Sequence, residues 1–160
     1  MEYRLCYKSP LGYLILKSDG ESVTGICFSE HELQEKDQEC SLLMDCRKQL
    51  EAYFEGKTLE FDLPLSPLGT PFQRKVWDEL MKIPKGQTIT YHELAIRLGD
   101  VKLVRAVGTA NGRNPVAIVI PCHRVIGAGN KLTGYAGGLH RKLWLLEHER
   151  KHLPAIGRLF

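Results

Sequence analysis

The segment VIPCHRVIG, residues 119–127, places Cys122, His123 and Arg124 in succession after an apolar run and a proline. A free thiol has a pKa of about 8.5 and is only slightly ionised at neutral pH, so a nucleophilic cysteine needs a base or a positive charge nearby. His123 could supply the base and Arg124 the charge. The segment therefore predicts a cysteine nucleophile, although a structural cysteine or a satisfied core histidine would explain either residue alone.

The geometry between Cys122 and His123 depends on the local backbone. Adjacent side chains on a strand point to opposite faces, so the two would interact through a water or through a helical turn after Pro121. A histidine base also needs an acceptor that orients its ring. Glu149 is the candidate, because it flanks the apolar stripe of a helix predicted over residues 138–152. That stripe includes Leu139, Leu143 and Leu146.

Metal coordination is the competing chemistry for the same segment. Zinc sites usually show ligand pairs separated by two to four residues, whereas Cys122 and His123 are adjacent and isolated. The first half of the chain offers no CxxC or CxxxH pair among Cys6, Cys27, His31, Cys40 and Cys46. We therefore interpret these as buried or incidental cysteines and predict no metal site. The odd number of five cysteines indicates free thiols in a reducing compartment.

The composition is that of a globular protein, with 43% hydrophobic and 26% charged residues in a chain of 160. No apolar run approaches the roughly 18–20 residues of a membrane span. The first ten residues lack the basic and apolar regions of a signal peptide, so we expect no membrane partner and a cytoplasmic location, or a nuclear one in a eukaryote.

Charge is distributed unevenly along the chain. Residues 1–70 contain 7 Lys and Arg against 13 Asp and Glu, a balance of −6, whereas residues 71–160 contain 15 against 6, a balance of +9. A basic half of this kind indicates an anionic partner such as nucleic acid. A solvated basic face is the alternative that charge alone leaves open.

The elements that would position these residues fall into two domains, which we place at 1–64 and 71–160 with an extended linker at 65–70. Residues 3–28 alternate and turn as two or three strands, and residues 30–55 have a helical pattern that ends at Gly56. A further strand precedes the linker in LEFDLPLSPLGTP, and the apolar run before Pro121 has the composition of a buried strand.

The second half has strong helix signals. Thr70 followed by Pro71 is an N-cap with proline at the first helical position, and Thr90 can cap a short helix that Gly99 ends. A further helix, VKLVRAVGTANG, follows at once, so the pair is typical of a helix-turn-helix or of any helical hairpin. Arg105 lies on this helix among the small residues Ala106, Gly108 and Ala110. Helix packing explains the small residues, and insertion into a nucleic-acid groove explains them together with the arginine.

Five segments of the chain together resemble one family. GTPFQRKVW, GQTITYHELA, RAVGTANGRNP, VIPCHRVI and GYAGGLHRKLWLLEHE resemble, in the same order, segments of the O6-alkylguanine-DNA alkyltransferases, also called methylated-DNA–protein-cysteine methyltransferases. The resemblance is strong over about residues 69–150 and rests mainly on SPLG before that. It implies a supporting α/β domain, ribonuclease-H-like with a small antiparallel sheet and a helix. It also implies a mostly α second domain with a winged-helix-like helix-turn-helix.

The resemblance assigns catalytic roles position by position. Cys122 would be the alkyl acceptor and His123 a base acting through water, with Glu149 polarising the histidine. Asn114 would order the turn that holds the site. Tyr91 would donate a hydrogen bond to the extruded guanine and help it leave.

It also implies how DNA is bound. The second helix of the helix-turn-helix would lie in the minor groove, where Arg105 would replace the extruded base and the small Ala106 and Gly108 would allow close approach. Arg113 would bind DNA beside them. The base would be contacted by the backbone of Cys122 and Val125 and covered by the loop of Tyr135, Ala136 and Gly137; some relatives have serine at the position of Ala136.

The implied activity is a single-turnover transfer of the alkyl group from O6-alkylguanine in double-stranded DNA, with O4-alkylthymine as a second candidate substrate. We expect a monomer that needs no cofactor. Three alternatives are a non-catalytic binder of alkylated DNA, a helix-turn-helix regulator and a cysteine hydrolase. Cys122 argues against the first, because those relatives have tryptophan there, and the basic half argues against the third.

Overall fold

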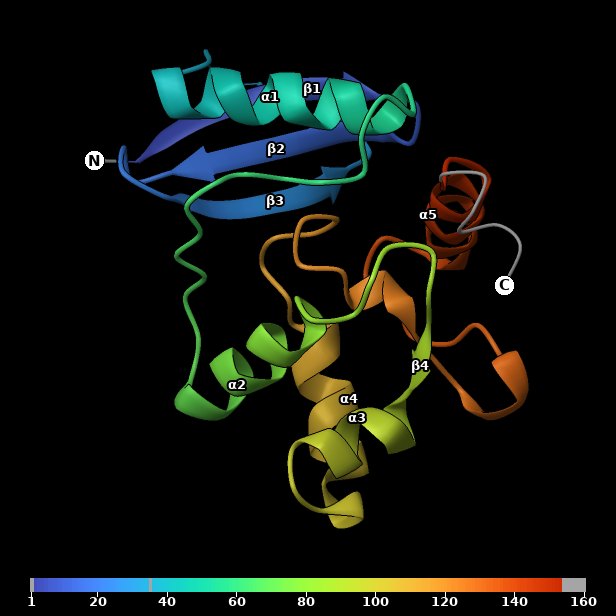
Figure 1. Ribbon diagram of the computed structural model, residues 1–160. Helices are drawn as coiled ribbons and strands as arrows, with labels where there is room; N and C mark the ends of the chain where they lie inside the picture. Colours follow the sequence, from blue (N-terminus) through green and yellow to red (C-terminus); the bar gives the residue numbers. More distant parts are fainter. Residues whose placement is uncertain (1, 35, 154–160) are drawn as a thin grey trace. The chain divides into compact units, whose positions relative to one another are not determined.

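The chain forms two compact units in the computed structural model, which describes residues 2–34 and 36–153 (Figure 1). One unit contains the residues up to Leu68 together with Pro115–Val119, and the other contains Gly69–Asn114 together with the residues from Ile120 onward. The predicted domain at 71–160 differs from this division at residues 115–119. These residues pack with the first unit because Ile26 donates to the carbonyl of Pro115 at 2.9 Å and accepts from Ala117 at 2.9 Å.

The first unit is an antiparallel sheet in the order β1-β2-β3, formed by β1 (Tyr3–Ser9), β2 (Gly12–Ser18) and β3 (Val23–Ser29). Gly12 has a φ of 108°, which the tight turn after β1 requires and which glycine adopts without strain. Leu14, Ile15 and Leu16 of the central strand are all buried. Helix α1 (Ser41–Phe54) lies along the sheet and buries Leu43 and Leu50 (Figure 1).

The helix predicted over residues 30–55 is shorter than expected, because it begins only at Ser41. The preceding acidic segment pairs with the edge of the sheet instead: Arg4 and Gln38 exchange two backbone hydrogen bonds of 3.0 Å. Asp37 Oδ1 also accepts from the backbone N–H of Cys6 at 3.2 Å. Pairing with the edge strand therefore supplies hydrogen-bond partners for this segment, although its composition alone favoured a helix.

Two predicted strands are absent from the described part of the chain. In the segment LEFDLPLSPLGTP, the one described residue that pairs with a strand is Leu65, at the start of the predicted linker, in an isolated bridge to Val23. The prolines of this segment cannot donate to a ladder. In the run before Pro121, Val116 forms one bridge with Ile26. Ile118 then has a φ of 73°, which ends any extended pairing.

The second unit is mostly helical, as predicted. It contains α2 (Pro71–Leu80), α3 (Tyr91–Arg97), α4 (Val104–Gly112) and α5 (Leu139–Lys151), and a short 3-10 turn, η1 (Val101–Leu103), precedes α4. Two-residue strands β4 (Ile89–Thr90) and β5 (Val125–Ile126) pair in parallel. Further 3-10 turns are η2 (Cys122–Arg124) and η3 (Ala128–Asn130).

Helix caps fix the starts of α2 and α3. The Thr70 hydroxyl accepts a hydrogen bond from the backbone N–H of Gln73, and the Gln73 side chain accepts one from the backbone N–H of Thr70, which completes a capping box. At the start of α3, the Thr90 hydroxyl accepts from the backbone N–H of Glu93. Both predicted N-caps are confirmed. Trp77 of α2 is 2% exposed and its Nε1 donates to the carbonyl of Ala110 at 2.9 Å, which ties α2 to α4. Within residues 2–34 and 36–153, no helix has the length and apolar character needed to cross a membrane.

Candidate active site

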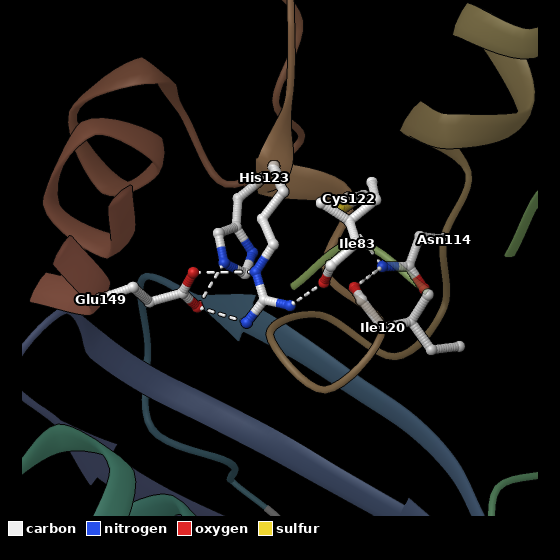
Figure 2. Close-up of polar contacts among 7 residues, drawn as sticks. Ile83, Asn114, Ile120, Cys122, His123 and Glu149 are labelled. Carbon is white, nitrogen blue, oxygen red and sulfur yellow. Dashed lines mark hydrogen bonds and ion pairs between the residues drawn. The ribbon is translucent and has the colours of Figure 1, made fainter. Parts of the chain in front are cut away.

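A short turn holds Cys122. After Pro121 the backbone enters η2, where Arg124 N–H donates to the carbonyl of Pro121 at 3.0 Å. The side-chain amide of Asn114 donates to the carbonyl of Ile120 at 2.7 Å and to Sγ of Cys122 at 3.1 Å (Figure 2). Because Asn114 donates hydrogen bonds both to the backbone of the turn and to Sγ of Cys122, it fixes the thiol relative to that backbone. A helical turn after Pro121, one of the two arrangements expected from the sequence, is therefore present.

Asn111 is a second amide at this turn that the sequence did not indicate. It is 1% exposed on α4, and its Nδ2 donates to the carbonyl of Cys122 at 3.3 Å. The RAVGTANG segment of α4 therefore contacts the turn that contains Cys122.

Cys122 is a buried residue, 7% exposed. Burial raises its pKa, and the hydrogen bond from Asn114 and the positive charge of Lys142 oppose that rise. Cys46 in the first unit is buried too, and burial raises the pKa of its thiol to about 12 without any opposing donor. All five cysteines are free thiols. Cys122 is thus distinguished from the other buried cysteine by groups that stabilise its thiolate.

His123 and Glu149 form a buried pair, both 0% exposed, with Nε2 of the histidine 2.8 Å from Oε2 of the carboxylate (Figure 2). Among the residues that the structure describes, no donor or acceptor reaches the other ring nitrogen, Nδ1. Arg124 joins the same carboxylate through Nε at 2.8 Å and Nη2 at 3.0 Å. Burial opposes ionisation of Glu149, but the contacts with His123 and Arg124 hold the pKa of its carboxyl well below the usual range.

Helix α5 presents a different face to the core from the one that the sequence predicted. Leu139 and Leu143 are 47% and 44% exposed, so the expected apolar stripe is wrong. The buried face consists of Arg141, Lys142, Leu145, His148 and Glu149. Glu149 therefore lies within the buried face rather than beside it, and charged partners rather than leucines determine the orientation of the helix.

Lys142 is a fully buried cation that the sequence analysis did not single out. Its Nζ donates to the carbonyl of Thr133 at 2.6 Å and lies 5.8 Å from the ring centre of Tyr91. Burial lowers the pKa of Lys142 to about 8, and the charge of Cys122 opposes that shift. Its spacing of seven residues from Glu149 is the one signal that could have placed it on the buried face.

Tyr91 begins α3, and its hydroxyl donates to the same Thr133 carbonyl at 3.1 Å. Burial raises the pKa of Tyr91, and the contact with Thr133 partly opposes the shift. Its ring lines an open hollow of about 720 Å³ between α3, α4 and the loop of residues 133–136. Of the predicted site residues, the hollow is lined by Tyr91, Arg105, Gly108, Tyr135 and Ala136.

The remaining predicted residues lie elsewhere in this unit. Ala106 and Arg113 are exposed, the first on α4 and the second at its C-terminal end. Val125 is fully buried in β5, and the carbonyl of Gly137 accepts from Nη1 of Arg141 at 3.1 Å. Cys122 does not line the hollow. In the described part of the chain, no cluster of three or more His, Cys, Asp or Glu side chains could hold a metal ion.

Comparison with known protein families shows which family this chain belongs to. The ribonuclease-like domain of 6-O-methylguanine DNA methyltransferase matches residues 3–67, and the DNA-binding domain of the same protein matches residues 71–151. The chain belongs to the 6-O-methylguanine DNA methyltransferase family. The family resemblance seen in the sequence, and the division into a small antiparallel α/β part and a helical part, are confirmed.

Relatives in this family cover almost the whole chain. The methylated-DNA–protein-cysteine methyltransferase of Methanosarcina acetivorans is 45% identical over 152 residues, which are 92% of this chain and 97% of that protein. The protein of the same name from Mycobacterium bovis is 44% identical over 156 residues, 95% of this chain and 94% of the relative.

Solved structures of the family agree with the fold. The crystal structure of Mycobacterium tuberculosis O6-methylguanine methyltransferase has a TM-score of 0.87 at 43% identity and covers 100% of this chain and 99% of that one. The Mycobacterium tuberculosis protein OGT in complex with DNA has a TM-score of 0.84 at 44% identity, with 97% of both chains covered.

Proposed function

We propose that this chain repairs DNA by direct reversal, transferring an alkyl group from O6 of guanine to Sγ of Cys122 in a single turnover. The observation that supports this most strongly is the position of Cys122, whose thiol accepts a hydrogen bond from Asn114 next to the His123–Glu149 pair. The relatives from Methanosarcina acetivorans and Mycobacterium bovis are named methylated-DNA–protein-cysteine methyltransferases, which supports a protein cysteine as the acceptor.

The chemistry uses only groups of this chain. The thiolate of Cys122 attacks the sp³ carbon of the alkyl group, an S–C bond forms and the C–O bond to guanine breaks. His123 accepts the thiol proton, and Glu149 holds the resulting imidazolium. The departing guanine takes up one proton, for which the Tyr91 hydroxyl is the proposed donor, so the overall reaction moves the thiol proton to guanine. The product is a thioether, which has no carbonyl for water to attack. The protein is therefore consumed by one reaction, and no cofactor takes part.

Access to the lesion requires the base to leave the duplex, at a cost of a few kcal/mol. Arg105 is exposed on α4 beside the hollow and has the length to occupy the space that the base leaves. The small Ala106 and Gly108 allow close approach of α4 to the minor groove, and Arg113 adds positive charge at the end of the helix. The DNA complex of the Mycobacterium tuberculosis relative supports this part of the proposal.

The hollow receives the extruded guanine. The Tyr91 hydroxyl, which now donates to Thr133, would turn to donate to the purine and help it leave. Tyr135, Ala136 and Gly137 form the covering loop, and the backbone at Cys122 and Val125 contacts the base edge. The domain of residues 1–64, joined by the linker at 65–70, supports the reacting domain at 71–160. One copy contains every group that the reaction needs, so the protein acts as a monomer, in a reducing compartment that keeps its five thiols free.

A transfer assay tests the proposal. Protein incubated with duplex DNA that contains labelled O6-methylguanine should take up one methyl group per chain and no more. After trypsin digestion, the peptide of residues 114–124 should gain the mass of one methylene, about 14 Da. Cys46→Ala serves as the matched control, because it removes the other buried thiol and should leave uptake unchanged. Methyl removal by Cys122→Ala, or uptake well above one group per chain, would show that the mechanism is wrong.

A further inference from the structure

Asn111 has a buried hydrogen-bond acceptor that no described residue uses. The residue is 1% exposed on α4, and its Nδ2 donates to the carbonyl of Cys122 at 3.3 Å. Because a carbonyl can only accept, this contact fixes which end of the amide faces Cys122. The other end, Oδ1, is buried and has no hydrogen-bond partner within residues 2–34 and 36–153. Most buried polar atoms in proteins are paired, so an unpaired acceptor next to the Cys122 turn indicates a place for a donor on a ligand.

The amide of Asn111 lies where the hollow meets the Cys122 turn. Gly108, one turn earlier on α4, lines the hollow, and so does Tyr91. Burial raises the pKa of Tyr91; Thr133 opposes that rise, Cys122 adds to it, and Asn111 opposes it. A side chain that lowers the pKa of a phenol does so as a donor, so the Nδ2 end of Asn111 faces Tyr91 as well and Oδ1 stays unused.

The alkylated base offers a single kind of donor to such an acceptor. In O6-alkylguanine the alkyl group leaves N1 as an acceptor, and N3 and N7 are acceptors too. The exocyclic 2-amino group is therefore the only N–H donor of this base in DNA. O4-alkylthymine has no N–H donor, because its N3 has also become an acceptor.

We propose that Asn111 is a specificity-determining residue, whose Oδ1 accepts a hydrogen bond from the 2-amino group of the extruded guanine. The proposal rests on the proposed function, because it assigns a contact to the substrate of that reaction. Guanine pairs an acceptor that a base without the amino group leaves buried and unpaired, which costs binding energy. Asn111 thereby selects alkylated guanine over alkylated thymine.

The competing explanation is that Asn111 only braces the Cys122 turn through Nδ2. Loss of a brace displaces the thiol in the same way whichever base is bound, so it changes the rates on all substrates by one factor. The ratio of rates on two substrates cancels that factor. A comparison of this ratio between the wild-type protein and an Asn111 variant therefore separates a contact with the base from a brace.

Rapid-quench methyl transfer is measured with three duplexes, which contain O6-methylguanine, O6-methylhypoxanthine or O4-methylthymine at the same position. O6-methylhypoxanthine has hydrogen in place of the 2-amino group and is otherwise the same base as O6-methylguanine. Asn111→Leu replaces the amide by an apolar group of similar size, and Asn111→Ala serves if the leucine variant does not fold. Gln49→Leu is the matched control, because it removes an amide that exchanges two hydrogen bonds with the backbone of Asp62 in the first unit.

The wild-type protein and Gln49→Leu should share one preference for O6-methylguanine over O6-methylhypoxanthine. In both Asn111 variants, we expect this preference to be about tenfold smaller, the size of one hydrogen bond to a buried group. The preference for O6-methylguanine over O4-methylthymine should fall by a similar factor. Equal rate ratios in the wild-type protein and in the Asn111 variants would overturn the proposal and leave Asn111 as a brace.

Binding gives a second measurement that needs no transfer. Cys122→Ala protein, with and without Asn111→Leu, is titrated with the O6-methylguanine and O6-methylhypoxanthine duplexes, and fluorescence anisotropy gives the affinities. A preference for the amino-bearing base that Asn111→Leu removes supports the contact, whereas the same preference in both proteins, or none in either, overturns it. A wild-type protein that transfers no methyl group contradicts the proposed function instead, and the titration still decides the role of Asn111.

Discussion

The side-chain amide of Asn114 lies 3.1 Å from Sγ of Cys122 and donates a hydrogen bond to it. The same Nδ2 donates to the carbonyl of Ile120 at 2.7 Å, so one side chain fixes the turn and contacts the thiol of Cys122. A donor to sulfur favours the thiolate, whereas burial raises the pKa of the Cys122 thiol. The reactivity of the cysteine therefore depends on a residue eight positions earlier in the chain.

Asn114→Ala should make Cys122 less reactive without removing it. The thiol loses a donor, so its pKa should rise and its alkylation by iodoacetamide at pH 7 should slow about tenfold per pK unit gained. The measurement uses a background in which Cys6, Cys27 and Cys40 are replaced by serine, with Cys122→Ala as the blank. An unchanged rate against pH would mean that Asn114 orders the turn and does not act on the sulfur.

Glu149→Gln should destabilise the protein strongly. Removing one partner of a buried ion pair typically costs about 3–5 kcal/mol, because Arg124 would remain charged and incompletely paired. Urea unfolding at pH 7 should show this loss, and the exposed Glu147→Gln on the same helix should show almost none.

The pairing of Glu149 also makes the free energy of unfolding depend on pH in the acidic range. Because the folded pKa of Glu149 is depressed from its ordinary value of 4.5, its contribution to stability is complete above about pH 5 and is lost as the pH falls toward the depressed value. The difference between the wild-type protein and Glu149→Gln should therefore be constant from pH 5 to pH 7 and should narrow below pH 4. A difference that stays constant down to pH 3 would contradict the ionised, paired carboxylate.

Lys142→Met should change the pH dependence of stability on the alkaline side, between about pH 8 and pH 10.5. The folded pKa of Lys142 is lowered from 10.5 to about 8, so the folded state binds fewer protons than the unfolded state between these values. The wild-type protein should gain roughly 2–4 kcal/mol as the pH rises through that window, relative to the variant. Subtracting the two unfolding curves removes the titrations of cysteine and tyrosine that both proteins share.

The same substitution tests the link between Lys142 and the thiol. Loss of the cation should raise the pKa of Cys122 and slow its alkylation at pH 7. Lys82→Met, which removes an exposed lysine after α2, is the matched control. Equal alkylation rates in both variants would show that Lys142 does not act on the nucleophile.

The fold was predictable where local signals agree with tertiary contacts. The Thr70–Pro71 and Thr90 caps placed α2 and α3 correctly, because a cap is a local hydrogen bond. The segments at 30–40 and 115–119 were misjudged, because their backbone groups pair with strands far away in the sequence. No local pattern reports that Gln38 will bond to Arg4, or that Pro115 will bond to Ile26.

In the active site too, features set by local sequence were predictable and features set by tertiary contacts were not. Adjacent Cys122 and His123 indicated a nucleophile from residue type alone, and the structure does bring Glu149 to the histidine. Arg124 was expected to supply a charge, but its pairing with Glu149 was not anticipated, and neither were the contacts of Lys142 and Asn111. Buried charges on α5 have no hydrophobic signature, so the pattern selected the exposed Leu139 and Leu143 as the core face. A charged residue can only be placed inside once its partner is known, and each partner here is a tertiary contact.

Arg105→Ala should slow transfer from duplex DNA and leave the chemistry at Cys122 intact. Arg105 lines the hollow, which Cys122 does not, so its proposed role is to stabilise the DNA duplex after the base has left. Extrusion costs a few kcal/mol and about 1.4 kcal/mol is a factor of ten in rate, so we expect a roughly 10- to 100-fold loss on duplex substrate. Reaction with free O6-alkylguanine base, which needs no extrusion, should be unchanged. Arg150→Ala, an exposed arginine on α5, controls for the loss of positive charge. An equal loss on duplex and free base would place Arg105 in the chemical step instead of in base extrusion.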